Sequence, residues 1–436
     1  MIIILSPYRS NRLEFICQFI FSEQLGVDYQ IIVAQENFEF NSETCVIGYG
    51  VSQSHLKTFN LPCRGLLFEQ DIHPQEINVE SFQSQFEPSQ KIKSFFNEPG
   101  YDFTFDLFSA CFYLLSRYEE YLPHQKDAFG RFPHTASLAF KNDFLDQPLI
   151  NIWIKEFKKA LQLRFKNVHF NSPVFQSIVT YDIDMAWSYQ NKGLFRNLFG
   201  FLKSPSLERL KVLSGLQKDP FDQFDFLSEI NEKWKLNGIY FFLLAKSRSA
   251  FDKNIHPNHP EWMKQIQRIS KKHKTGIHPS YYSMDQPKQI DSELKNLSEI
   301  TKTEIVRSRQ HYLRFSLPET YRTLAECGIE KEYSMGYGSI NGFRASFAGS
   351  FLWFDVLNDT TTQLRIFPFS YMDANSIFEE KITAAEAKIK FIEHLNVCKE
   401  TNGLFISVFH NHLLTKDADG NDWRMLFENV IPQTQQ

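Results

Sequence analysis

The strongest constraint on the fold is a repeated alternation of strand-like and helix-like segments after residue 172. Four apolar runs are each followed by a helical pattern. The runs are residues 174–184, 238–245, 276–280 and 304–315, and the helical patterns that follow them are residues 222–236, 261–274, 291–301 and 319–326, respectively. Further strand candidates are residues 342–346, 364–370 and 404–410, with a helical pattern at 379–400. This order is typical of parallel strands joined by crossover helices. About seven such strands predict an α/β fold, a distorted (β/α) barrel over residues 172–436.

Residues 1–171 are expected to form a separate, small α/β domain. A chain of 436 residues with 42% hydrophobic composition is long and apolar enough for two cores. Strand candidates and helical patterns alternate in this region too. The strand candidates are residues 2–5, 29–33 and 44–47, and the helical patterns are residues 106–122 and 149–165.

The charge balance indicates which partners to exclude. The 47 basic and 51 acidic residues nearly cancel and form no block of like charge, so nucleic acid and anionic membranes are not expected partners. No apolar run approaches the roughly 20 residues of a membrane span, and the six cysteines form no Cys-x-x-Cys pair. A cytoplasmic protein with a neutral or mildly polar ligand is therefore expected.

Two aspartates close the first strand of the predicted barrel. The segment Thr180-Tyr181-Asp182-Ile183-Asp184 follows an apolar run, and strand alternation places both carboxylates on one face. Carboxylates this close repel each other unless a cation or a proton lies between them. The alternative is one aspartate that caps a helix and one in a salt bridge. Their position at the carboxyl end of a barrel strand favours a functional site.

Two histidines on later strands are candidate ligands for the same cation. His278 ends the third predicted strand, and a neutral imidazole is a common partner of carboxylates on zinc-like metals. A lone histidine is more often structural, but this one is expected to face Asp182 and Asp184. His311 lies in the fourth predicted strand among three arginines, which equally fits a solvated edge.

An arginine and a histidine complete the set of candidates. Arg344 stands in the apolar, small-residue run 342–346, where a buried guanidinium needs a carboxylate partner, and Asp182 is the expected one. A surface salt bridge is the alternative. His410 ends the last predicted strand, where it can act as a general acid. His412 and Asn411 are expected to be loop residues.

Taken together, these motifs resemble the polysaccharide deacetylase (NodB-type, carbohydrate esterase) family over about the last 260 residues. The matching segments are Thr180 to Asp184, His278 to Tyr282, Gly342 to Arg344 and Ile406 to His410. The resemblance implies a divalent metal, zinc first. It makes Asp184 and His278 metal ligands, Asp182 the general base, Arg344 the group that orients this base, and His410 the acid.

The sequence departs from the family at one metal ligand. Where the family has its second metal-binding histidine, this chain has Tyr282. A catalytic zinc site usually keeps three protein ligands, so another residue must supply the third. His311 is the first candidate. Other candidates are Asp252, His256 and Asp373.

The whole chain further resembles deacetylase-like proteins that carry an amino-terminal domain of unknown function. Residues 116–121 and 127–132 look like recurring segments of that domain. The resemblance assigns no activity to them. The acidic pair Glu119-Glu120 is interpreted as a solvated helix turn.

These residues predict a metal-dependent hydrolase that removes an N- or O-acetyl group from a sugar, glycan or glycan precursor. A catalytically inactive, deacetylase-like carbohydrate-binding or assembly protein is the alternative, motivated by Tyr282. A glycosidase ranks last. Its two carboxylates normally flank the substrate about 5 Å or more apart, and two aspartates separated by one residue on a strand, Asp182 and Asp184, are badly placed for that.

Overall fold

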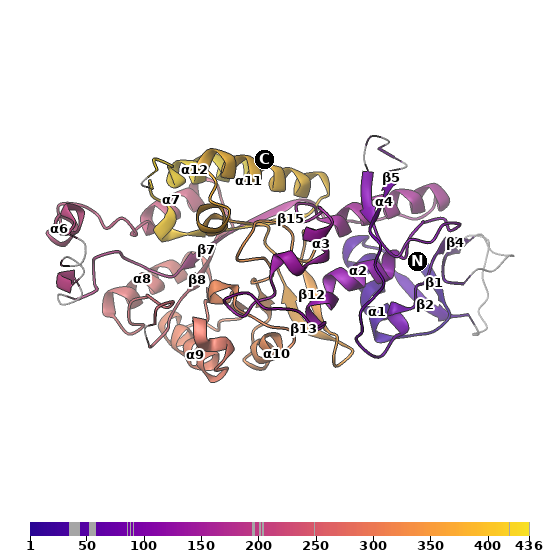
Figure 1. Ribbon diagram of the computed structural model, residues 1–436, viewed down its shortest axis with the longest axis horizontal. Coiled ribbons are helices and arrows are strands. Elements are labelled where there is room, and N and C mark those ends of the chain that lie inside the picture. Colours follow the sequence, from indigo (N-terminus) through magenta and orange to yellow (C-terminus); the bar gives the residue numbers. More distant parts are fainter. Residues whose placement is uncertain are drawn as a thin grey trace.

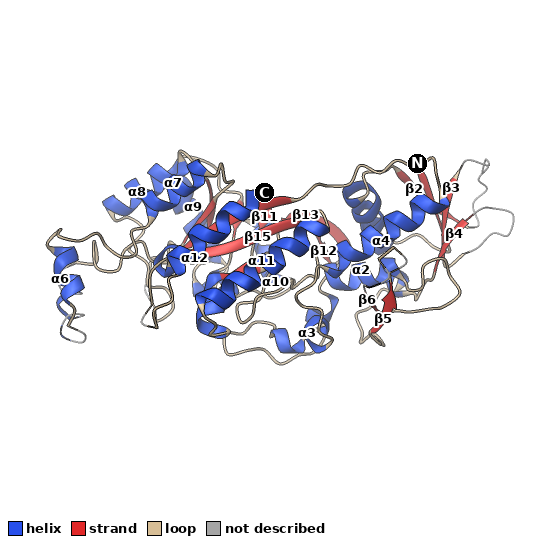
Figure 2. Ribbon diagram, turned by 90° about the horizontal axis from the view of Figure 1, so that it is seen from above, coloured by secondary structure: helices blue, strands red, loops and turns tan. Residues whose placement is uncertain are grey.

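The computed structural model shows an elongated molecule with a β-sheet in each of its two regions (Figure 1). The first region lies at one end of the long axis, and helix α6 (Leu207–Leu213) projects at the other, as Figure 2 also shows. The structure describes residues 1–34, 44–51, 58–84, 86–87, 89, 91–193, 197–199, 202, 205–247, 249–417 and 419–435.

The first region contains a four-stranded parallel sheet in the order β2-β1-β3-β4. Its strands are β1 (Ile2–Ser6), β2 (Tyr29–Val33), β3 (Cys45–Tyr49) and β4 (Thr58–Leu61). Around it lie α1 (Asn11–Cys17), α2 (Leu107–Leu115), α3 (Leu138–Lys141), α4 (Leu149–Arg164) and the hairpin of β5 (Glu80–Gln83) and β6 (Lys91–Ser94). The three predicted strands are confirmed, and β4 was not predicted.

The second region is built on a nine-stranded sheet in the order β12-β13-β11-β10-β9-β8-β7-β15-β14. Only the β12–β13 pair is antiparallel, which confirms the predicted parallel strands. The strands are β7 (Gln176–Ile183), β8 (Ile239–Phe242), β9 (Lys274–Ile277), β10 (Arg307–Ser308), β11 (Lys331–Glu332), β12 (Phe351–Asp355), β13 (Thr360–Ile366), β14 (Tyr371–Met372) and β15 (Leu404–His410).

Helices connect these parallel strands, as the crossover rule requires. They are α7 (Phe224–Lys233), α8 (Pro260–Ser270), α9 (Lys288–Thr301), α10 (Glu319–Glu326), α11 (Ala384–Glu400) and, after the last strand, α12 (Trp423–Val430). Within the ranges described, no helix is both long and apolar enough to cross a membrane.

The register of the sheet brings the predicted site residues to one edge. β7 pairs with β15 so that Asp182 lies opposite His410. On its other side β7 pairs with β8, which in turn pairs with β9. The carboxyl ends of parallel strands meet at the same edge. Side chains that leave β7, β9 and β15 at their ends therefore converge.

One predicted strand is wrong. Residues 342–346 form turns rather than a strand. Gly342 has φ +146°, Ser346 has φ +49°, and the amide of Phe343 donates to the carbonyl of Leu145 in the first region. The segment therefore turns along the interface between the two regions, and the apolar pattern reflects burial there.

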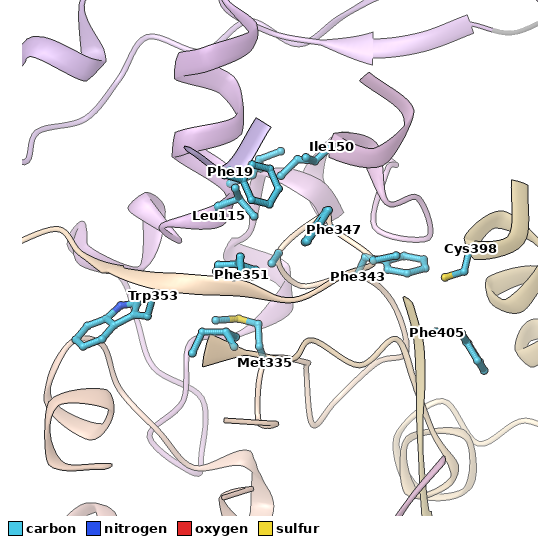
Figure 3. Close-up of a cluster of buried hydrophobic side chains, with 14 of the residues drawn as sticks. Phe19, Leu115, Ile150, Met335, Phe343, Phe347, Phe351, Trp353, Cys398 and Phe405 are labelled. Atoms are coloured by element: carbon cyan, nitrogen blue, oxygen red, sulfur yellow. The ribbon is translucent and has the colours of Figure 1, made fainter. Parts of the chain in front are cut away.

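The two regions share one continuous hydrophobic core, which runs from Ile2 to Ile431. The rings of Phe19 and Phe347 are 5.0 Å apart, and those of Phe112 and Phe354 are 5.2 Å apart. Figure 3 shows this contact between side chains of the first region (Phe19, Leu115, Ile150) and of the second (Phe343, Phe347, Phe351). Many phenylalanines of this chain thus join the two regions.

A buried carboxylate in β11 predicts a pH-dependent stability. Burial raises the pKa of Glu332 to about 7, although Ser334 and Tyr321 donate hydrogen bonds to it. Between pH 4.5 and 7 the folded state keeps a proton that the unfolded state releases, so stability falls as pH rises. Glu332→Gln should remove this loss, about 3 kcal/mol across the window. Urea unfolding at pH 4.5, 6 and 8 measures it.

The exposed Glu326→Gln is the matched control, because it removes a carboxylate of the same kind from the surface of α10. It should keep the pH slope of the wild type. An equal slope in wild type and Glu332→Gln would contradict the prediction.

Candidate functional site

Three histidine side chains face the carboxylate of Asp184. His278 Nε2 lies 3.2 Å from Asp184 Oδ1, and the Nε2 atoms of His311 and His410 each lie 3.8 Å from Asp184 Oδ2. The three imidazoles are buried, and Asp184 is partly buried. Asp184 follows β7, His278 follows β9, and His410 ends β15. The shared strand edge thus brings these four residues together.

Each of these rings is held through its other nitrogen, Nδ1, by an oxygen atom. The contacts are His278 Nδ1 to the Arg309 carbonyl at 2.5 Å, His311 Nδ1 to Asp252 Oδ1 at 3.0 Å, and His410 Nδ1 to Asp373 Oδ1 at 2.6 Å. Such partners fix the orientation and the tautomer of a ligating histidine. All three Nε2 atoms are therefore turned toward the carboxylate of Asp184.

The hydrogen bond of His278 shows what its contact with Asp184 needs. A carbonyl oxygen only accepts, so Nδ1 carries the proton, and a neutral His278 ring presents a bare Nε2 to Asp184 Oδ1. Oδ1 is buried and accepts no hydrogen bond from the described part of the chain. Two lone pairs 3.2 Å apart repel each other, and a cation, either a metal ion or a proton, removes the repulsion.

The donor set fits a divalent metal. One oxygen of Asp184 and one nitrogen each of His278 and His311 lie within 4.8 Å of one another. Two imidazoles and a carboxylate are a ligand set typical of catalytic zinc. The geometry brings together the three residues named from the sequence as metal ligands. It places His311 in the 3₁₀ helix η6 (His311–Leu313), not in a strand.

The charges of the site reinforce one another. Burial alone would raise the pKa of Asp184, but His311, His278 and His410 hold it well below its usual range. Burial would lower the pKa of His311, and Asp184 and Asp252 instead raise it to about 9. For His410, Asp373 and Asp184 overcome burial and raise the pKa to about 10. In the metal-free site, both rings therefore carry a proton at neutral pH.

The partner of Asp182 is Arg309, not Arg344. Arg309 Nη1 donates to Asp182 Oδ1 at 2.9 Å and to Thr180 Oγ1 at 2.7 Å, and the guanidinium is buried. Asp182 Oδ2 lies 3.8 Å from His278 Nε2. Arg309 follows β10, whose carboxyl end lies next to that of β9. The expected pairing of Asp182 with Arg344 is wrong.

Arg344 instead binds a carboxylate of the first region. Its Nε and Nη2 donate to Glu120 at 2.9 and 2.7 Å. Arg117 donates to Glu120 at 2.8 Å and to Glu119 at 2.7 Å. Glu119 and Glu120 are buried, so their interpretation as a solvated turn is also wrong. The Arg344 guanidinium thus lies at the interface of the two regions, and its catalytic role stays a prediction.

The other third-ligand candidates occupy different places. Asp252 and Asp373 bind the Nδ1 atoms of His311 and His410, so they orient rings. His256 is exposed and accepts a hydrogen bond from a backbone amide of its own loop. Tyr282 is 40% exposed, and its ring packs against Phe251 and Tyr281.

A cavity of about 340 Å³ opens onto these side chains. Its wall includes Asp182, Asp184, the three histidines and apolar side chains such as Phe251, Tyr312 and Phe378. This size and mixture are typical of small-molecule sites. His412, expected to be a loop residue, also lines the cavity, and burial lowers its pKa to about 4. Sequence reasoning missed His412 because it lies two residues beyond the end of β15.

Comparisons with known proteins give one family match and several similar structures. Residues 2–166 match a family of unknown function, DUF7033, which covers less than half of the chain. No curated protein sequence matches. A putative polysaccharide deacetylase from Mycobacterium smegmatis is similar at 13% identity and a TM-score of 0.40, over 61% of this chain and 85% of that one.

Two further structures are similar at comparable levels. A polysaccharide deacetylase from Bacillus cereus has 9% identity and a TM-score of 0.32, over 59% of this chain and 86% of that one. The carbohydrate deacetylase Agd3 has 8% identity and a TM-score of 0.34, over 99% of this chain and 83% of that one. With likenesses this slight, the function has to be argued from the geometry of the site.

Proposed function

We propose that this protein is a metal-dependent hydrolase that removes an acetyl group, N- or O-linked, from a sugar, a glycan or a glycan precursor. The observation that carries the proposal is the largely buried cluster in which Asp184, His278 and His311 each offer one ligand atom within 4.8 Å of the others, with Oδ1 of Asp184 3.2 Å from His278 Nε2. Asp184, His278 and His311 are the proposed ligands. A divalent metal, zinc first, suits two nitrogens and one oxygen.

The proposal includes a closed, distorted barrel of about seven strands. β13 and β14 stand near opposite ends of the strand order, yet only residues 367–370 separate them. In that segment, Phe367 and Phe369 donate to the carbonyls of Glu332 and Met335, and Ser370 donates to the carbonyl of Ile406 in β15. These bonds support closure between β11 and β15. We also propose a boundary near residue 171, with domains at 1–171 and 172–436.

The proposed roles follow from the contacts. A zinc-like ion would act as a Lewis acid on the acyl carbonyl. Arg309 fixes Oδ1 of Asp182 at 2.9 Å, so Oδ2 is the oxygen that takes the proton from the attacking water. His410 is held at Nδ1 by Asp373, whose carboxylate raises the pKa of the ring and favours its protonated form. Its Nε2 can therefore donate a proton to the leaving nitrogen or oxygen.

The alternative function is a catalytically inactive, carbohydrate-binding protein. It is motivated by Tyr282, which stands where the resembling family has a metal-binding histidine and which packs against other rings. His311 weakens the argument for an inactive protein, because its Nε2 faces Asp184 from the neighbouring strand end. Metal content distinguishes the two functions.

Metal analysis and acetate release test the proposed function together. Protein purified without chelator should contain about one equivalent of divalent metal and release acetate from an acetylated sugar or glycan panel. Asp182→Asn should lower kcat by about 10²- to 10⁴-fold, because the general base is lost, while the metal stays bound. Asp291→Asn, at a half-exposed carboxylate in α9, is the matched control. A metal-free protein that binds sugars equally well without Asp184 would favour the alternative.

A further inference from the structure

A loop of the first region, residues 127–131, lies against the turn that carries His311. The loop is closed by its own aspartate, because Asp127 Oδ1 accepts from the amides of Phe129 and Arg131, both at 2.9 Å. Asp127 Oδ2 accepts from Arg131 Nε at 2.7 Å, and Gly130 has φ +77°. The loop therefore holds the Arg131 guanidinium in a fixed direction.

Three contacts join this loop to η6 and the residue after it. Arg131 Nη1 donates to the carbonyl of Tyr312 at 2.8 Å. In return, Arg314 Nε donates to the carbonyl of Phe129 at 2.9 Å, and the Phe129 and Tyr312 rings are 5.4 Å apart. Arg131 is only 6% exposed and also lines the cavity. These contacts are made directly after His311 in the sequence.

The turn after His311 needs such support. Tyr312 has φ +57° and Leu313 has φ +50°, a left-handed conformation that costs a non-glycine residue roughly 1–2 kcal/mol. A strained turn persists where its surroundings hold it. The amide and the ring of His311 are fixed by Pro279 and Asp252. The peptide carbonyl that follows one residue later is fixed by Arg131.

The space that the Arg131 guanidinium occupies is also specific, because it lies against Gly338. A Cβ atom on Gly338 would lie 2.1 Å from Arg131 Nη1, so the arginine passes directly over bare backbone. Gly338 does not have a positive φ, so alanine fits its backbone. A methyl group at position 338 would displace the Arg131 guanidinium without changing any residue of the first region.

We propose that Arg131 is a positioning residue for the metal ligand His311, and that the first region thereby completes the metal site. The inference rests on the proposed metal site. It gives residues 127–131 a role: they hold the carbonyl of Tyr312, and with it the turn that aims His311 at Asp184. Loss of this contact leaves the ligand present but less well oriented.

The affinity for Zn²⁺, measured by competition with a chromophoric chelator, tests this role. Arg131→Ala and Gly338→Ala should each weaken binding by about 10-fold or more, the effect of removing a group that orients a ligand. Arg131→Lys keeps one donor and should fall between Arg131→Ala and the wild type. Arg9→Ala, at an exposed arginine of the same region, should bind as the wild type does. The absorption spectrum with Co²⁺ should change in the two alanine variants.

Thermal unfolding of the metal-free proteins separates positioning from general destabilisation. Gly338→Ala retains both Asp127 and Arg131, so it should unfold near the wild-type temperature and still bind Zn²⁺ more weakly. Wild-type affinity in both alanine variants would overturn the inference and leave the proposed function intact. A wild-type protein that binds neither Zn²⁺ nor Co²⁺ would overturn the metal site itself.

Discussion

Replacement of Asp184 by asparagine should weaken Zn²⁺ binding by more than about 100-fold. Removing an outer partner of a ligand costs roughly 10- to 100-fold, and Asp184 is the proposed ligand itself. It is the carboxylate that all three histidine Nε2 atoms face. Asparagine keeps the size of the side chain and removes its charge. Isothermal titration with Zn²⁺ in metal-free protein measures the loss.

Asp291→Asn, at a half-exposed carboxylate, is the control for Asp184→Asn, and it should bind Zn²⁺ with wild-type affinity. His278→Ala should resemble Asp184→Asn, because it removes the second ligand. If Asp184→Asn bound Zn²⁺ as tightly as the wild type does, the metal would have to be held elsewhere in the chain.

Replacement of Arg344 by methionine should destabilise the protein by about 3–5 kcal/mol, the usual cost of removing one partner from a buried ion pair. Arg344 and Glu120 form a bidentate pair, and both are buried. Burial would raise the pKa of Glu120, but Arg344 and Arg117 lower it to about 2, so the carboxylate stays charged. Without Arg344, the cluster keeps an excess negative charge. Urea unfolding at pH 7 measures the change.

A double-mutant cycle attributes this loss to the pair. In Glu120→Met with Arg344→Met, Arg117 still pairs with Glu119, so the cluster is again neutral. The double variant should be less destabilised than the sum of the two single variants by about 0.5–3 kcal/mol. Arg424→Met, at an exposed pair, should change stability by less than about 1 kcal/mol. Additive effects at Glu120 and Arg344 would show that their contact contributes nothing.

Sequence periodicity predicted the regular elements best where the burial of apolar side chains alone sets the pattern. β15 and α10 have their predicted bounds, 404–410 and 319–326, because β15 is a short apolar run that is buried almost throughout and α10 repeats its buried positions at helical spacing. The alternation in β7 also brought Asp182 and Asp184 to the same site as His278. Local pattern sufficed because these side chains stand at the ends of long or central strands.

Contacts between the two regions could not be predicted in this way. Arg309 and Arg344 are both buried, and only the three-dimensional arrangement shows that Arg309 meets Asp182 within the second region and that Arg344 meets Glu120 across the interface. Glu119 and Glu120 have the composition of a surface turn. They are nevertheless buried, and Glu120 pairs with Arg344, which lies more than 200 residues away in the sequence. His311 lies in a left-handed turn whose support comes from residues 127–131. Such long-range pairings leave no periodic signal.

The continuous core has a consequence for modularity. Phe19 packs on Phe347, and Phe112 packs on Phe354, so each region fills space that the other leaves. A chimera that joined the second region to an unrelated first region would place side chains of mismatched shape at the interface between the two regions. Tightly packed interiors tolerate such mismatches poorly. The two regions therefore have to be exchanged together, because each forms part of the interior of the other.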